Sequence, residues 1–80
     1  MKHPLQTARE AERFTIQQVS DLLDVDVNDL IEIENGSRIP TVRLVAKLSR
    51  FFGFSQKAFM LRIAEYQKEI KRYDQIRLEF

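Results

Sequence analysis

The chain contains very few residues that interrupt regular structure: its 80 residues include two glycines and two prolines. Apolar residues recur at steps of three and four, and no alternating apolar and polar run of the kind found in strands persists. Glycine and proline are the strongest local breakers of helices, so their scarcity favours helices joined by short turns. The sequence therefore predicts an all-α fold.

Capping signals divide the chain into five helices. Thr15 and Gln18 have the spacing of a capping box, in which each side chain satisfies a backbone N–H of the other residue. Further N-caps are expected at Asp26, Thr41 and Ser55, and helix ends at Asn35-Gly36 and Gly53. The helices are expected at about 5–13, 15–23, 27–35, 42–52 and 55–78.

The apolar spacing also predicts which faces of these helices are buried. On the second helix the inward stripe is expected to consist of Val19, Leu22 and Leu23. On the fourth helix it is expected to consist of Val42, Val45, Leu48 and Phe52.

Composition and length exclude several classes of protein. A chain of 80 residues with 44% hydrophobic and 31% charged residues is typical of one small globular domain. It has no cysteine, and no apolar run approaches the roughly 18 residues of a membrane span. His3, the single histidine, is expected in a frayed terminus, and no glycine-rich phosphate loop or nucleophile elbow occurs. We therefore expect a cytoplasmic protein that is not an enzyme, with no cofactor, metal or small-molecule substrate and no membrane partner.

Charge is distributed unevenly although the net charge is only +1. Residues 15–36 contain six acidic residues and no basic one, whereas residues 37–57 contain five basic residues and no acidic one. An acidic block followed by a basic block requires a structural or functional explanation.

Five short segments occur in a recognisable order: Arg9-Glu10-Ala11, Phe14-Thr15, the turn from Leu22-Leu23 to Val25, Ile33-Glu34-Asn35-Gly36-Ser37-Arg38, and Pro40-Thr41. Their order and spacing resemble the phage Cro/repressor, or Xre-type, helix-turn-helix family over about residues 5–60. The resemblance implies a five-helix helix-turn-helix domain at 1–57 and an extended amphipathic helix at 58–80. Arg13 and Asp24 stand at two turn positions where relatives commonly have glycine, and aspartate tolerates a left-handed backbone better than most residues.

The resemblance also implies a function and a set of site residues. The chain would be a small transcription regulator whose third helix lies in the major groove of duplex DNA. The matching DNA-binding positions are Thr15, Ile16, Val27, Asn28, Asp29, Ile31, Glu32, Arg38 and Arg43. The resemblance further implies that Arg9 and Glu34 form a structural ion pair between the first helix and the end of the third.

The residues at these positions are unusual for a DNA-binding surface. Asn28 is suited to a bidentate contact with adenine, and Glu32 could accept a hydrogen bond from cytosine. Binding DNA also requires cations against the phosphates, because this interaction supplies nearly all of the non-specific affinity. The candidates for phosphate contact are Lys2, Arg13, Arg38 and Arg43.

A second hypothesis is that the same face binds a protein partner in place of DNA. Ile16, Val27 and Ile31 would form an apolar patch rimmed by acidic residues, which is typical of a protein-binding site. The partner could then be a repressor, and the chain an antirepressor, a repressor modulator or an antitoxin-like component. A third possibility is that these apolar and acidic residues are ordinary solvent-exposed surface with no partner.

The last helix carries an apolar seam at alternating steps of four and three, as in a coiled coil. The seam consists of Phe59, Ile63, Tyr66, Ile70, Tyr73 and Phe80, and Arg77 interrupts it. A parallel pair would place Glu69 near Asp74, so an antiparallel homodimer or packing on the domain's own core is favoured. A purely structural dimerisation unit is a further hypothesis.

Overall fold

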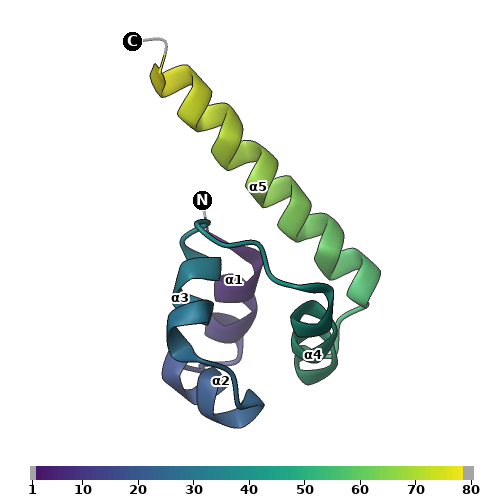
Figure 1. The fold of residues 1–80 in the computed structure, drawn as a ribbon. Coiled ribbons are helices and arrows are strands. Elements are labelled where there is room, and N and C mark those ends of the chain that lie inside the picture. The colour runs from purple at the N-terminus through teal and green to yellow at the C-terminus, as the bar shows by residue number, and fades with distance from the viewer. Residues whose placement is uncertain (1, 79–80) are drawn as a thin grey trace.

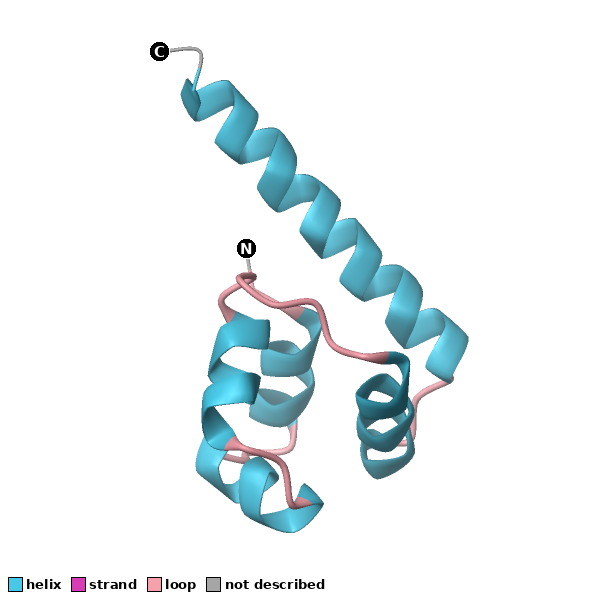
Figure 2. Cartoon of the chain, in the orientation of Figure 1, coloured by secondary structure: helices cyan, strands magenta, loops and turns pink. Residues whose placement is uncertain are grey.

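The computed structural model describes residues 2–78, and it describes side chains up to residue 70. Five helices connected by loops make up this part of the chain, which confirms the all-α prediction (Figures 1 and 2). Their bounds are α1 Pro4–Ala11, α2 Ile16–Leu23, α3 Val27–Glu34, α4 Val42–Phe52 and α5 Gln56–Leu78. None of the helices in residues 2–78 combines the length and the apolarity that crossing a membrane requires.

The predicted helix caps are present. In the capping box of α2, Thr15 Oγ1 accepts a hydrogen bond from the Gln18 N–H at 3.1 Å, and Gln18 Oε1 accepts one from the Thr15 N–H at 2.8 Å. Asp26 and Thr41 cap α3 and α4, and Ser55 Oγ accepts from the third residue beyond it at the start of α5. Local side-chain chemistry therefore fixes where the helices begin.

Two turns use a left-handed backbone without glycine. Arg13, between α1 and α2, has φ +61°, and Asp24, between α2 and α3, has φ +55°. These are the two positions at which relatives commonly have glycine. Aspartate tolerates this conformation better than arginine does, so the strain at Arg13 is the larger of the two.

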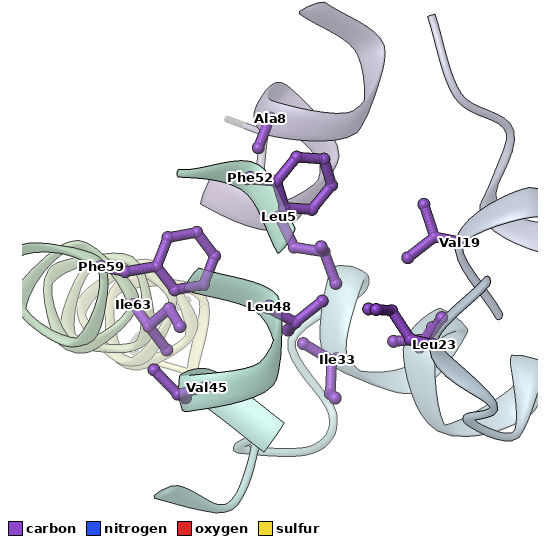
Figure 3. Packing of buried hydrophobic residues seen from close by; sticks show 11 residues of the cluster. Leu5, Ala8, Val19, Leu23, Ile33, Val45, Leu48, Phe52, Phe59 and Ile63 are labelled. Carbon is purple, nitrogen blue, oxygen red and sulfur yellow. The ribbon is translucent and has the colours of Figure 1, made fainter. Parts of the chain in front are cut away.

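The buried core is formed by all five helices, and Figure 3 shows its packing. Its members are Leu5, Ala8, Val19, Leu23, Leu30, Ile33, Val45, Leu48, Phe52, Phe59 and Ile63. Two of them, Phe59 and Ile63, come from the beginning of α5. The later part of α5 extends away from the other four helices (Figure 1). The first turns of α5 are therefore an integral part of the domain.

The apolar seam of α5 covers the domain's own core. Phe59, Ile63 and Tyr66 are buried within the chain, and Ile70 is half-buried beside Gly36. Of the two arrangements that the sequence favoured for this seam, packing on the core is the one observed at these positions. The Tyr73 side chain and Phe80 lie outside the described residues.

Two residues of the predicted buried stripes are exposed instead. Leu22 is 59% exposed and Val42 is 62% exposed. On α2, Val19 and Leu23 lie one turn apart and face the core, so Leu22, about 100° around the helix from Leu23, faces solvent. On α4 the inward face begins one turn later, at Val45.

The expectation that His3 lies in a frayed terminus is wrong. The side chain is fully buried, and its Nδ1 accepts a hydrogen bond from the Leu5 N–H at 2.9 Å. Because Pro4 has no N–H to donate, Leu5 provides the first amide that α1 must satisfy, and His3 is its cap. The imidazole ring also meets the Tyr66 ring edge to face, with centroids 4.7 Å apart. His3 therefore joins the start of α1 to α5.

Burial of His3 makes the stability of the domain sensitive to acid. Burial lowers the pKa of His3 from 6.5 to about 4, so between these values the unfolded chain binds a proton that the folded chain excludes. His3 therefore costs no stability well above pH 6.5, and the free energy of unfolding falls as the pH drops from 6.5 toward 4. Between pH 7 and pH 5 the loss from this residue is expected to be about 2 kcal/mol. Urea unfolding at both pH values measures it.

The matched variant for this measurement is His3→Asn. Asparagine supplies a capping acceptor and does not titrate, so the loss between pH 7 and pH 5 should shrink by about 2 kcal/mol in the variant. An equal pH dependence in both proteins would show that His3 is protonated as easily in the fold as in the unfolded chain.

Candidate nucleic-acid interface

The turn between α2 and α3 fixes the angle between the two helices. Ser20 is buried, its Oγ donates to the carbonyl oxygen of Val25, and its own carbonyl accepts from the Val25 N–H at 3.0 Å. Asp24 supplies the left-handed residue between them. Leu23 and Leu30 pack beneath the turn in the core. This arrangement holds α3 against α2 and leaves one face of α3 toward solvent.

Polar and charged side chains occupy most of that outer face. Asn28 is exposed, and Asp29 and Glu32 are each less than half exposed. Thr15, at the start of α2, is exposed while its hydroxyl oxygen serves the capping box. Of the polar members of the predicted DNA-binding set, Asp29 and Glu32 are brought together by their shared ion-pair partner, Arg38.

The apolar members of the set do not form the patch that was expected. Ile16 is only partly exposed because it packs against the hydrophobic core. Val27 is half-buried, and Ile31 is 44% exposed. Only Ile31 of the three presents a large exposed side chain, so the apolar surface available to a protein partner on this face is smaller than the sequence suggested.

The ion pair between Arg9 and Glu34 has the predicted partners. Arg9 Nε donates to Glu34 Oε2 at 2.7 Å, and Arg9 Nη2 donates to Oε1 at 2.9 Å. Nη1 also donates to the carbonyl oxygen of Phe14 at 3.1 Å. The two charged side chains are only 16% and 9% exposed. The hydrogen bonds to Glu34 raise the pKa of Arg9, and the pair fastens α1 to the end of α3.

Arg38 is placed differently from the expected phosphate contact. Its guanidinium lies over the outer face of α3, where Nε donates to Glu32 Oε2 at 2.7 Å and Nη1 is 3.6 Å from Asp29 Oδ1. The hydrogen bond to Glu32 raises the pKa of Arg38. Two of the acids that would repel DNA on this face are therefore paired with a cation from the same chain.

Among the other predicted phosphate contacts, Lys2 has an ion-pair partner within residues 2–70, whereas Arg13 and Arg43 have none there. Lys2 pairs with Glu10 at 2.6 Å, which leaves it directed toward α1. Arg13 and Arg43 are exposed. Lys2 and Arg38 thus each form an ion pair with a carboxylate of their own chain, and a phosphate contact by any of the four cations stays a prediction.

The structure also reveals a row of basic residues on α4, which in the sequence is only part of the basic block at 37–57. Arg43, Lys47 and Arg50 are exposed and follow one another at steps of four and three, which places them on one face of the helix. No ion pair within residues 2–70 involves any of the three. The helical spacing was a signal that could have identified this row.

The basic row borders a cleft whose opposite side is acidic. The cleft has a volume of about 630 Å³ and lies between α4 and the α2–α3 turn. Its charged lining consists of Asp24, Asp26, Asp29, Arg38, Arg43, Lys47 and Arg50. Three acidic residues of the first charge block and four basic residues of the second therefore line one cleft. Within the described residues, no group of three or more histidine, cysteine or acidic side chains could hold a metal ion.

Comparison with known proteins supports the interpretation of this fold. A profile described as a helix-turn-helix domain matches residues 5–65, which include α1–α4 and the beginning of α5. No curated protein and no solved structure gave a significant match.

Proposed function

The chain belongs to the helix-turn-helix domain family, and on that premise we propose that it is a small transcription regulator that binds duplex DNA. In this proposal α3 lies in the major groove and Asn28 faces the bases. The observation that carries the proposal is the pairing of Arg38 with Glu32 at 2.7 Å and with Asp29 at 3.6 Å. This pairing removes much of the repulsion that an acidic reading helix would meet from phosphates.

The cations that engage phosphates in this proposal are those of the basic row on α4. Arg43, Lys47 and Arg50 are exposed, lie on one helix face and have no acidic partner in the described part of the chain. Arg43 lies at the beginning of α4, next to the loop that follows α3. Such a row supplies the sequence-independent part of the affinity, while α3 supplies the contacts to bases.

We further propose that the protein acts as a homodimer in the cytoplasm, since two half-sites in an operator require two domains. The exposed apolar side chains on α5, Met60 and Leu61, support self-association through this helix. The seam residues Phe59, Ile63 and Tyr66 are engaged in the core, so the proposed contact uses the other faces of α5. No catalytic role is proposed.

The decisive experiment is titration of the purified protein with random-sequence duplex DNA from low to moderate salt. Three phosphate contacts from each protomer, six for the proposed homodimer, are expected to give a linear fall of log affinity against log salt with a slope of about −5. Absence of binding at low salt would contradict the proposal and direct attention to a protein partner at Ile31.

Replacement of Arg43 by alanine is expected to weaken binding to every sequence by a similar factor. Removal of one phosphate contact from each protomer should make the salt slope of the homodimer shallower by about 2, because two fewer counterions are released. Fluorescence anisotropy with a labelled random duplex measures both effects. Arg62→Ala, an exposed arginine on α5, is the matched control and should leave the slope unchanged. Equal effects of the two substitutions would show that α4 has no special role in binding.

A further inference from the structure

The backbone of Arg38 is held against the end of α3 by hydrogen bonds. The N–H groups of Ser37 and Arg38 both donate to the carbonyl oxygen of Glu32, at 3.0 and 3.2 Å. Asn35 Oδ1 also accepts from the Ser37 N–H at 2.9 Å. The loop therefore folds back onto the last turn of α3, and the side chain of Arg38 begins beside the helix whose outer face it covers.

The guanidinium of Arg38 is also oriented by carboxylates. Glu32 holds Nε, and Asp29 lies near Nη1. Arg38 and Glu32 are each about half-exposed, so the contact is made at the surface of α3. An arginine has five N–H donors in a planar fork, and the hydrogen bond to Glu32 uses only one of them. The other N–H donors of Arg38 stay available to bind a base. They lie next to Glu32, at the surface of α3 that would face the bases.

A cation held in this way is better suited to reading a base than to holding a phosphate. A phosphate contact requires charge and tolerates many orientations, whereas guanine presents two acceptors, O6 and N7, to a correctly oriented pair of donors. A carboxylate that fixes the fork before DNA arrives also reduces the side-chain entropy lost on binding.

We propose that Arg38 reads a guanine in the major groove and that Glu32, assisted by Asp29, is the positioning residue that orients it. The inference rests on the proposed DNA-binding function and deepens it. Glu32 acts through Arg38 and does not contact cytosine. Arg38 determines sequence preference, and the basic row on α4 supplies the phosphate contacts.

The test begins with selection of a preferred duplex by the wild-type protein from a randomised duplex library. Affinities are then measured for duplexes that carry each of the four base pairs at every selected position. We expect one position to require guanine, and Arg38→Ala should reduce the preference there by roughly 5- to 150-fold, the range for loss of one bidentate contact.

The positioning role is tested with Glu32→Gln, which removes the charge but keeps the size of the side chain. This variant should lose most of the preference for guanine at that position while its affinity for random duplex stays equal or rises. In an Arg38→Ala background the same change should have no further effect on base preference, because Glu32 acts through Arg38. Glu65→Gln, an exposed acid on α5, is the matched charge control and should leave base preference unchanged. Circular dichroism melting of each variant checks that the domain is folded.

The alternative roles give different results. If Arg38→Ala weakened all sequences equally and Glu32→Gln strengthened all sequences equally, Arg38 would be a phosphate contact and the inference would be overturned. If Glu32→Gln altered preference equally with and without Arg38, Glu32 would contact the base directly. If the wild-type protein bound no duplex at low salt, the proposed function would fail, and the inference would fail with it.

Discussion

Replacement of Arg9 by methionine is expected to lower the free energy of unfolding by about 3–5 kcal/mol, the usual result of removing one member of a buried ion pair. Methionine fills much of the volume of the arginine stem but leaves the Glu34 carboxylate, which is 9% exposed, without its two hydrogen bonds. Urea unfolding followed by circular dichroism at neutral pH measures the loss.

A double variant separates the cost of an unpaired buried charge from the net contribution of the Arg9–Glu34 pair to the free energy of unfolding. Arg9→Met combined with Glu34→Leu removes both charges, and most of the lost stability should return because no buried carboxylate remains. A double variant that is less stable than Arg9→Met alone would show that the pair itself holds α1 and α3 together more strongly than apolar contact can.

Replacement of Phe59 by alanine is expected to cost about 3–5 kcal/mol, because it removes a large buried ring from a small core. Phe59 is fully buried and stacks near Phe54, with ring centroids 5.6 Å apart. A small domain has few core residues to compensate, so much of its total stability of about 5–15 kcal/mol depends on this contact. Thermal and urea unfolding of the variant measure the loss.

Arg62→Ala is the matched control for this experiment. Arg62 lies three residues along the same helix, is exposed and is not among the residues proposed for self-association, so its replacement should change the free energy of unfolding by less than about 0.5 kcal/mol. Similar losses for the two variants would contradict the assignment of Phe59 to the core, whereas a large difference would establish that α5 is part of the folding unit.

The helices could be predicted from sequence because their ends are determined by neighbouring residues. A capping box, as at Thr15, requires only residues three apart, and no tertiary contact is needed to recognise it. Which face of each helix is buried was less predictable. Leu22 and Val42 have the spacing of core residues, but which side of an eight- or eleven-residue helix meets its neighbours depends on how all five helices pack.

The ion pairs of the candidate site were only partly predictable from the sequence. The Arg9–Glu34 pair followed from the resemblance to a known family, since no local rule relates residues 25 positions apart. The Arg38–Glu32 contact was missed because the two residues are six apart, a spacing that does not place side chains together on a helix. It arises because the loop turns back over α3. The capping role of His3 was missed because a single histidine near a chain end has no pattern to mark its burial.

The basic row on α4 differs from the charges on α3 because it has no ion-pair partner within residues 2–70, and this difference has a consequence for kinetics. If α3 reads DNA as proposed, its acidic residues, of which Arg38 offsets one charge, contribute no long-range attraction, so the field of Arg43, Lys47 and Arg50 would govern the first encounter with DNA. Association rates should then depend on ionic strength and hardly on sequence. In the same proposal, the time that the protein stays on one site is set by the short-range contacts of α3, so arrival and residence would be controlled by different helices.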